Sequence, residues 1–227
     1  MRYKKIAEGK FISRPNRFIA EVVIDGETHI CHVKNTGRCR ELLIPGVTVY
    51  LAESDNPSRS TRYDLVAVKK GSTIINIDSQ APNKAVYEWI ENGGFFRNIT
   101  LFKPETKYGS SRFDLYLEAD GRRIFAEVKG VTLEEDGVVM FPDAPTERGV
   151  KHLEELISAV KEGYDAYVFF VIQMERCRYF TPNARTHPEF ADTLRRAERE
   201  GVRVFALTCA TEPNSLEING FAEVRLN

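Results

Sequence analysis

Three polar residues in the second half of the chain have the types and spacing of a hydrolytic metal site. Asp114 lies in the strand-like segment SRFDLYLEA, and Glu127 and Lys129 lie in the next segment, RRIFAEVKG. Because side chains alternate faces along a strand, Glu127 and Lys129 should point the same way. Asp120-Gly121 between the segments is a strong signal for a two-residue hairpin turn. The hairpin would bring Asp114 opposite Glu127.

The same alternation predicts the surroundings of Asp114. Phe113, Leu115 and Leu117 should form one apolar face, with Asp114 pointing to the other side. Two carboxylates held together repel each other and require a cation between them, and their oxygen atoms suit Mg²⁺ or Mn²⁺. Such an ion can activate water for hydrolysis of a phosphodiester, while Lys129 orients that water or stabilises the transition state. The alternative is a solvated strand face with an ordinary Glu-Lys ion pair.

The segments around these residues predict the elements that hold them. KAVYEWIENGG has apolar residues at helical spacing and ends in Gly93-Gly94, which predicts a helix over about residues 84–92. Three strands should follow, in ITLFKPETK, SRFDLYLEA and RRIFAEVKG. A helix in ERGVKHLEELISAVKEG and a strand in DAYVFFVIQ come next, and a helix in PEFADTLRRAEREG and a strand in VRVFALT extend the sheet.

The first third of the chain is rich in short β-like runs. Between Phe18 and Asp78 they are FIAEVVI, THICHVK, VTVYLAE, DLVAVKK and STIINID, separated by turn-prone residues. Five short strands with a basic surface favour an OB-fold, although the barrel could instead only brace a second domain. We expect an α/β (α+β) chain, with an OB-like five-stranded barrel over residues 1–80 and an α/β domain with a central mixed sheet over residues 81–227.

Composition narrows the class of protein. A chain of 227 residues with 42% hydrophobic residues can form two compact units. It has no apolar run near the roughly 20 residues of a membrane span and no secretory signal, so we expect a cytoplasmic protein without a membrane partner. The four cysteines form no CxxC pair, which argues against a structural zinc site. Residues 1–70 carry 13 Lys and Arg against 8 Asp and Glu, whereas the remainder carries 19 against 25. The first 70 residues are thus basic and the remaining residues are acidic.

The predicted order over residues 80–173 resembles the core of the PD-(D/E)xK nuclease superfamily: a helix, a three-stranded meander, a helix and a strand. Nearly the whole chain also resembles the sugar fermentation stimulation protein family, known as SfsA, through TGRCRELLIPG, APNKAVYEWI, ETKYGSSRFD, FAEVKGVTL and FPDAPTERGVKHLEEL. By position, Asp114 matches the acidic residue of the nuclease motif, Glu127 its D/E position and Lys129 its lysine. Phe113 stands where a proline often precedes the acidic residue. The resemblance implies an OB-like domain joined to a restriction-endonuclease-like domain.

The resemblance also implies further ligands. Many members of the superfamily have a Glu on the first helix that reaches the metal, and Glu88 fits by order, with Glu91 as the substitute in another register. The alternative for Glu88 is a helical ion pair with Lys84, four residues earlier. Gln173, at the end of the fourth strand, is a further candidate. The expected metal ligands are therefore Asp114, Glu127 and Glu88, with Lys129 completing the catalytic set.

Candidate contacts to nucleic acid are residues at the start of the second core helix and in one barrel loop. They are Arg148, Lys151 and His152 in ERGVKH, and Arg38 and Arg40 in the loop that also holds Thr36 and Gly37. Simple solvation of the helix is the alternative for the first group. Aromatic residues of the barrel could stack on bases, or else pack in the core; they are Phe11, Phe18, Tyr50 and Tyr63.

Two functions follow from these patterns. The first is a nuclease that hydrolyses phosphodiester bonds of DNA or RNA with Mg²⁺ or Mn²⁺. The second, from the family resemblance, is a DNA-binding transcriptional regulator of sugar (maltose) metabolism without turnover in bacteria. The retained Asp, Glu and Lys favour the first. Both predict nucleic acid as the partner, and the sequence leaves open whether a homodimer forms.

Overall fold

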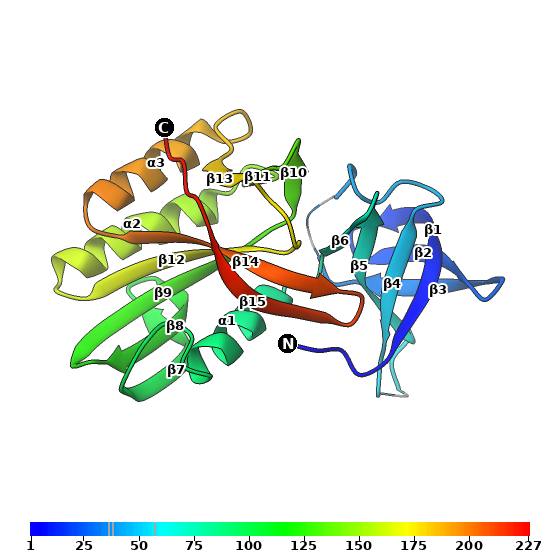
Figure 1. Cartoon of the computed structure of the whole chain (residues 1–227), viewed down its shortest axis with the longest axis horizontal. Helices are drawn as coiled ribbons and strands as arrows, with labels where there is room; N and C mark the ends of the chain where they lie inside the picture. Colours follow the sequence, from blue (N-terminus) through cyan, green and yellow to red (C-terminus); the bar gives the residue numbers. More distant parts are fainter. Residues whose placement is uncertain (36, 38, 57) are drawn as a thin grey trace.

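The chain folds into two units that lie side by side, a β-barrel and an α/β unit (Figure 1). The computed structural model describes residues 1–35, 37, 39–56 and 58–227. Among the described residues, no helix is both long enough and apolar enough to cross a membrane.

The first unit is a closed barrel. Its strands are β1 (Ile6–Asn16), β2 (Ile19–Ile24), β3 (Glu27–Val33), β4 (Thr48–Glu53) and β5 (Tyr63–Lys70). β1 pairs with β2 and β4, and a parallel pairing of β3 with β5 closes the ring. The alternation that predicted strands also sets the core, since Ala20, Val22 and Ile24 of β2 are buried. The predicted OB-like barrel of five strands is confirmed.

The identity of one barrel strand differs from the prediction. The segment STIINID contains β6 (Thr73–Asn76), which pairs with β5 outside the closed ring. The fifth barrel strand is instead β1, in a segment that was not predicted to be a strand. Gly9, Pro15 and the charged residues of β1 obscure its alternation, and only two of its residues, Gly9 and Phe11, are buried.

A mixed sheet forms the centre of the second unit, as predicted, but it has six strands because β15 was not predicted. Its strands are β7 (Ile99–Tyr108), β8 (Ser111–Ala119), β9 (Arg122–Val131), β12 (Asp165–Ile172), β14 (Arg203–Glu212) and β15 (Ser215–Ala222). The order is β15-β14-β12-β9-β8-β7, with β9, β12 and β14 parallel to one another. A separate small sheet, which was not predicted, contains β10 (Leu133–Glu135), β11 (Val138–Phe141) and β13 (Tyr179–Pro182). β9 is an inner strand of the large sheet.

Three helices cover this sheet. α1 (Ala81–Glu91) packs on one face, and α2 (Glu147–Lys161) and α3 (Pro188–Arg199) pack on the other (Figure 1). α1 begins three residues earlier than predicted, because Pro82 is well tolerated in a first helical turn. At the start of α2, the Thr146 hydroxyl accepts a hydrogen bond from Gly149 N at 3.0 Å. This cap fixes where α2 starts beside the end of β9.

The hairpin between β8 and β9 has the predicted turn. Asp120 and Gly121 have φ values of 51° and 73°, as a two-residue turn that matches the strand twist requires. The turn sets the register in which Leu115 faces Ala126.

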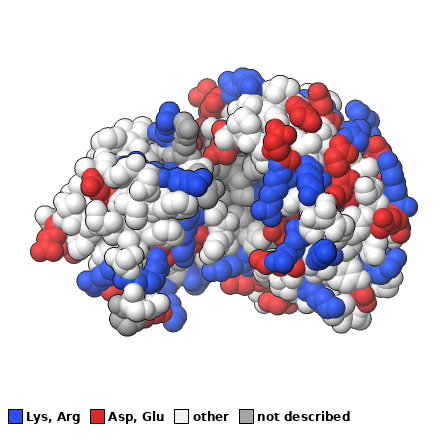
Figure 2. All heavy atoms as spheres, turned by 180° about the vertical axis from the view of Figure 1, so that it is seen from behind, with Lys and Arg blue, Asp and Glu red and all other residues white. Residues whose placement is uncertain are grey.

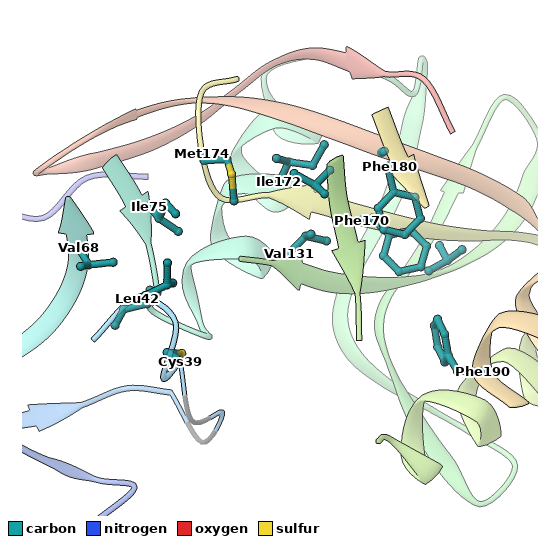
Figure 3. Packing of buried hydrophobic residues seen from close by; sticks show 14 of the residues in the cluster. Cys39, Leu42, Val68, Ile75, Val131, Phe170, Ile172, Met174, Phe180 and Phe190 are labelled. Atoms are coloured by element: carbon teal, nitrogen blue, oxygen red, sulfur yellow. The ribbon is translucent and has the colours of Figure 1, made fainter. Parts of the chain in front are cut away.

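The barrel and the α/β unit share one core. Leu42 and Val68 of the barrel belong to the same buried cluster as Val131 and Phe170 of the sheet (Figure 3). Between the units, Asn76 N donates to the carbonyl of Gln173 at 2.9 Å. Gln173 Nε2 in turn donates to Asn76 Oδ1 at 3.1 Å and to the Asp78 carbonyl at 3.2 Å. The two units are therefore held in a defined arrangement.

Candidate active site

Glu127 and Lys129 lie on the inner strand β9 with their side chains toward α2. Glu127 is 3% exposed. Its Oε1 accepts a hydrogen bond from Lys129 Nζ at 2.5 Å and another from Nδ1 of His152, on α2. The Lys129 side chain is also largely buried. The alternative of a solvated Glu-Lys face therefore does not describe this pair.

His152 is held from both sides. Arg148 Nε donates to His152 Nε2 at 3.2 Å. Since an arginine only donates hydrogen bonds, Nε2 is the bare nitrogen and Nδ1 carries the proton that is donated to Glu127. The His152 ring is buried and supports Glu127. His152 also lines the groove between the β7–β8 hairpin and α2, and its contact with a nucleic-acid backbone stays a prediction.

Asp114 approaches Glu127 from β8. The ladder between β8 and β9 stops one residue short of this pair, so the two strands diverge where the carboxylates lie. Asp114 Oδ2 accepts a hydrogen bond from Val128 N at 2.8 Å, and Oδ1 accepts one from Asn83 Nδ2 of α1 at 2.8 Å. The Tyr87 hydroxyl, one turn further along α1, donates to the Asp114 carbonyl at 2.6 Å.

The predicted apolar face around Asp114 is not continuous. Leu115 and Leu117 pack in the cluster on the α1 side of the sheet, whereas Phe113 packs on the α2 side, against Phe125 and His152. The simple alternation therefore breaks at Asp114. The break coincides with the end of the pairing between β8 and β9, whereas the pairing of β8 with β7 continues through Phe113.

The two carboxylates differ in their affinity for protons. Burial, followed by the nearby charge of Glu127, raises the pKa of Asp114 to about 6. Burial also acts to raise the pKa of Glu127, but the Lys129 ammonium and the hydrogen bond from His152 outweigh it and hold that pKa below its usual value. The Glu127 carboxylate is thus ionised at neutral pH and repels a second charge on Asp114.

One atom of this pair has no partner. Glu127 Oε2 is buried and, in the part of the chain that the structure describes, has no hydrogen-bond donor. A buried carboxylate oxygen without a donor is costly, and native structures rarely contain one without a ligand. Together with Asp114, it offers the oxygen donors that a hard divalent cation prefers. These residues fit a metal ion.

The structure does not bring Glu88 to this site. Its carboxylate forms an ion pair of 2.7 Å with the amino group of Met1, and its side chain is 56% exposed. The predicted ion pair with Lys84 is not formed among the described residues either. On α1, the side chains that reach Asp114 are Asn83 and Tyr87, because positions four apart share a helix face. No hydrogen bond or ion pair in the described chain links Glu91 to the carboxylates.

Gln173 is also placed differently from the prediction. It is 2% exposed, and its Nε2 is used at the junction between the units rather than at the carboxylates.

A basic groove lies beside the carboxylates. It has a volume of about 740 Å³ and is lined by the β7–β8 hairpin and the first turns of α2. Its cations are Lys107, Arg112, Arg148 and Lys151, and Glu147 is its one carboxylate. Figure 2 shows Lys and Arg side chains on both sides of a hollow between the two units. Arg148 and Lys151 line this groove, and their contacts with phosphate stay a prediction.

The barrel residues predicted to bind nucleic acid differ in exposure, and two of them are not described by the structure. Arg38 and Thr36 lie outside the described residues. Arg40 is exposed and lines a hollow of about 490 Å³ with Arg14 and Arg17. Of the aromatic candidates, Phe18 is 45% exposed, whereas the other three are buried in the core: Phe11, Tyr50 and Tyr63.

A second acidic cluster lies at the edge of the groove, formed by Glu147, His187 and Glu189. Thr146 N donates to His187 Nδ1 at 3.3 Å, so the proton of the neutral ring is on Nε2, the atom that faces the two carboxylates. A protonated nitrogen cannot bind a metal. This cluster is therefore less suited to a cation than the Asp114–Glu127 pair.

Asn83, Tyr87 and the support that His152 gives Glu127 were not predicted from the sequence. The spacing of four between Asn83 and Tyr87, and between Arg148 and His152, is a usable signal. It becomes informative only once it is known which helix face meets the carboxylates.

Comparisons with known proteins agree with this architecture. Residues 80–215 match the family described as sugar fermentation stimulation protein RE domain, and residues 12–77 match the SfsA N-terminal OB domain. A sugar fermentation stimulation protein homolog of Desulfitobacterium hafniense (strain DSM 10664 / DCB-2) is 59% identical over 226 residues, covering 100% of this chain and 99% of the relative. A homolog from Clostridium beijerinckii is 57% identical over 226 residues and is covered completely, as is this chain. The solved structure of Pyrococcus furiosus SfsA in complex with Ca²⁺ is 29% identical, with a TM-score of 0.91 over 99% of this chain and 98% of that one.

Proposed function

This chain belongs to the sugar fermentation stimulation protein family, and from its site we propose that it is a divalent-metal-dependent nuclease that hydrolyses phosphodiester bonds of DNA or RNA. The observation that carries the proposal is the buried, unpartnered Glu127 Oε2 beside Asp114, a carboxyl group whose pKa is raised to about 6. A cation between the two groups would stabilise the doubly ionised form of this pair. Mg²⁺ and Mn²⁺ are the ions that we propose.

Asp114 and Glu127 would hold the metal, through the oxygen lone pairs that the protein does not use. When bound, the metal would supply a nucleophilic water at neutral pH and charge neutralisation at the phosphate. The Pyrococcus furiosus SfsA, a relative of the same fold, was solved in complex with Ca²⁺. That supports a hard, oxygen-bound divalent cation in this family.

The surrounding residues have separate tasks. Lys129 holds an ammonium group beside the carboxylates, where it can donate a hydrogen bond to the attacking water or to a phosphate oxygen. Asn83 and the Val128 amide fix both oxygens of Asp114. His152, braced by Arg148, fixes Glu127. The carboxylates are thus oriented before a substrate arrives, as efficient electrostatic catalysis requires.

The groove beside the site supports nucleic acid as the substrate. Four cations against one carboxylate line it, in a chain whose formal net charge is −1. A local excess of Lys and Arg next to a hydrolytic centre is suited to the phosphates of a polynucleotide. In the barrel, the arginines around Arg40 would hold the strand further from the site.

The test is a cleavage assay with labelled single-stranded and double-stranded DNA and RNA, in Mn²⁺, in Mg²⁺ and in chelator. The wild-type protein is expected to cut at least one substrate in Mn²⁺ and none in chelator. Asp114→Asn and Lys129→Ala should each lower the rate at least about 100-fold, as expected when one preorganised charged group is removed from a polar site. Asp136→Asn and Lys69→Ala are matched controls on exposed residues and should cut normally.

Calorimetry with Mn²⁺ separates the metal from the chemistry. Binding should be present in the wild type and lost in Asp114→Asn. Cleavage that survives Lys129→Ala or chelator would refute this site. Tight binding of DNA without cleavage of any substrate would favour the regulator instead.

A further inference from the structure

A second cavity, distinct from the basic groove, lies at the junction of the two units. It has a volume of about 310 Å³. Asn35 and Gly37 line it from the barrel, Gly130 and Thr132 from the end of β9, and the segment 141–146 from the loop before α2. Its size is at the lower end of the range for small-molecule sites, about 300 to 1,000 Å³. It can hold one small ring system but not a duplex.

The lining has the chemistry of a site for a neutral, planar, hydrogen-bonding group. Of the twelve described residues that line it none is Lys or Arg, and Asp143 is the one charged residue among them, which favours a neutral group over a phosphate. Its hydrogen-bonding groups are amides and hydroxyls, including Gln173, Thr132 and Ser79. Phe141 is the aromatic residue among those that line the cavity, and its ring also packs against Phe170 and Phe190. Neutral donors and acceptors next to an aromatic ring are what a nucleobase requires.

Two of these residues, Gln173 and Thr132, have side-chain oxygens whose hydrogen-bonding capacity is unused within the described part of the chain. Gln173 is held through its Nε2 by Asn76 and by the Asp78 carbonyl. Its Oε1 and the Thr132 hydroxyl accept or donate no hydrogen bond among the described residues. Gln173 is 2% exposed and Thr132 is 9% exposed. The fixed amide oxygen can accept a hydrogen bond from a planar group bound in this cavity, and the unused hydroxyl can donate or accept another.

The position of the cavity links it to the carboxylate site. Gly130 directly follows Lys129 on β9, and Thr146 is the N-cap of the helix that carries His152. A side chain at Gly130 would collide with Gln173 Oε1 and lie 2.9 Å from Pro82 Cγ, so only glycine lets the Gln173 amide pack this closely on β9. The carboxyl ends of β9 and β12, which are parallel neighbours, meet here. Ligands of α/β sheets commonly bind at this end of the strands.

We propose that this cavity, here called the junction cavity, binds the base of one unpaired nucleotide next to the phosphate that is cut. The inference rests on the proposed nuclease function and specifies its substrate. The strand passes from the basic groove across the carboxylates, and the base beyond Lys129 turns into the junction cavity. The substrate is therefore single-stranded, or contains an unpaired nucleotide, because a base in a duplex cannot enter without leaving its stack.

The first test measures binding in chelator, so that no cleavage occurs. The probe is a fluorescein-labelled single strand of about 12 nucleotides, within the site size of OB-fold proteins, compared with the same sequence as a blunt duplex. Ala144→Phe places a ring in the junction cavity from an exposed loop position, and Ala184→Phe makes the same change at another exposed alanine. Ala144→Phe should weaken single-strand binding about tenfold, the loss expected when one base no longer stacks. Ala184→Phe and the duplex should show no such change.

The second test scans a single abasic nucleotide along the strand and measures cleavage by the wild type in Mn²⁺. One position beside the cut should lower cleavage about tenfold, and the others should not. If the protein cuts the strand but cleavage is the same at every position of the abasic nucleotide, the proposed role of the junction cavity is refuted and the nuclease proposal is unaffected. Equal binding by Ala144→Phe and the wild type would also refute that role, as would equal losses in both phenylalanine variants. If nothing is cut but Ala144→Phe alone weakens single-strand binding, the junction cavity is supported and the nuclease fails.

Discussion

Two sites in this molecule bury carboxylate groups, and they differ in whether the chain itself balances the negative charge. In the barrel, Asp64 of β5 is 4% exposed and is surrounded by partners. Arg59 binds both of its oxygens, at 2.6 and 3.0 Å, Lys34 Nζ lies at 3.1 Å and His32 Nδ1 at 3.0 Å. Burial acts to raise the pKa of Asp64, but Arg59, Lys34 and His32 outweigh it and lower that pKa to about 2.

At the Asp114–Glu127 pair, the protein places two carboxylates against one ammonium. The pKa of Asp114 rises to about 6, and one oxygen of Glu127 has no donor. The difference shows how burial alone misleads: both sites are buried and charged, yet only one is balanced by the chain itself. A complete set of partners indicates a structural role, and an incomplete set indicates a ligand from outside.

The largest expected effect on stability is at the balanced site. Asp64→Ala removes the carboxylate that Arg59, Lys34 and His32 share. It leaves the Arg59 guanidinium without its ion-pair partner, while of the described residues Lys34 keeps only Asp78, at 3.8 Å. We expect the free energy of unfolding to fall by about 3 kcal/mol, as when one partner of a buried ion pair is deleted. Denaturant unfolding measures it. Binding of Mn²⁺ should be unchanged, because the site is in the other unit.

Asp55→Ala is the matched control, since the Asp55 pair with Lys4 is solvent-exposed and should contribute little. The contribution of Asp64 should also depend on acid in a definite direction. Its pKa is about 2 in the folded state and about 3.8 in the unfolded state, so its stabilisation is complete above about pH 4 and is lost as the pH falls toward 2. An Asp64→Ala variant as stable as the Asp55→Ala control would show that the two sites do not differ in this way.

The unbalanced site should have the opposite pH dependence. Without metal, folded Asp114 keeps its proton up to about pH 6, whereas the unfolded chain loses it near 3.8. The stabilisation is therefore present at low pH and is lost as the pH rises through 6. Between about pH 5 and pH 7.5, the wild type should lose about 1 kcal/mol relative to Asp114→Asn. Thermal unfolding in chelator across that range measures the difference in slope.

The slope is the decisive quantity, because the amide introduced by Asp114→Asn would face a donor and add a constant cost at every pH. Mn²⁺ should abolish the wild-type slope by keeping Asp114 ionised. Parallel pH curves for the two proteins in chelator would contradict the raised pKa of Asp114 and, with it, the contrast between the sites.

The fold was largely predictable from local patterns. Alternation gave four of the five barrel strands, and the Asp120-Gly121 turn gave the β8–β9 hairpin with its register. Strand β1 was not predicted because few of its residues are buried, so its alternation is weak. β10, β11 and β13 were not predicted because each is only three or four residues long, and β13 is held by pairing with β11, about 40 residues earlier. Such pairing leaves little trace in sequence spacing.

The sequence was enough to predict that the three main site residues lie together on neighbouring strands. It was not enough to predict which side chains hold them in place. Strand alternation and the hairpin were enough to put Asp114, Glu127 and Lys129 together. They could not show that Asn83 rather than Glu88 faces Asp114, because that depends on how α1 is rotated against the sheet. The roles of His152 and Gln173 depend on packing between α2 and β9 and between the two units. Asp64 shows the same limit, since its partners come from two separate segments, His32 and Lys34 at the end of β3 and Arg59 in the loop before β5.

The smallest expected effect tests whether the partners of Asp64 act together. His32→Ala removes a half-exposed donor while Arg59 and Lys34 remain, so the free energy of unfolding should fall by less than about 1 kcal/mol. The same substitution in an Asp64→Ala background should cost still less, because the acceptor is already gone. The difference between the two costs is the coupling between His32 and Asp64, and denaturant unfolding of the four proteins gives it. If His32→Ala costs the same in both backgrounds, the ring does not share in balancing Asp64, and the balance depends on Arg59 and Lys34 alone.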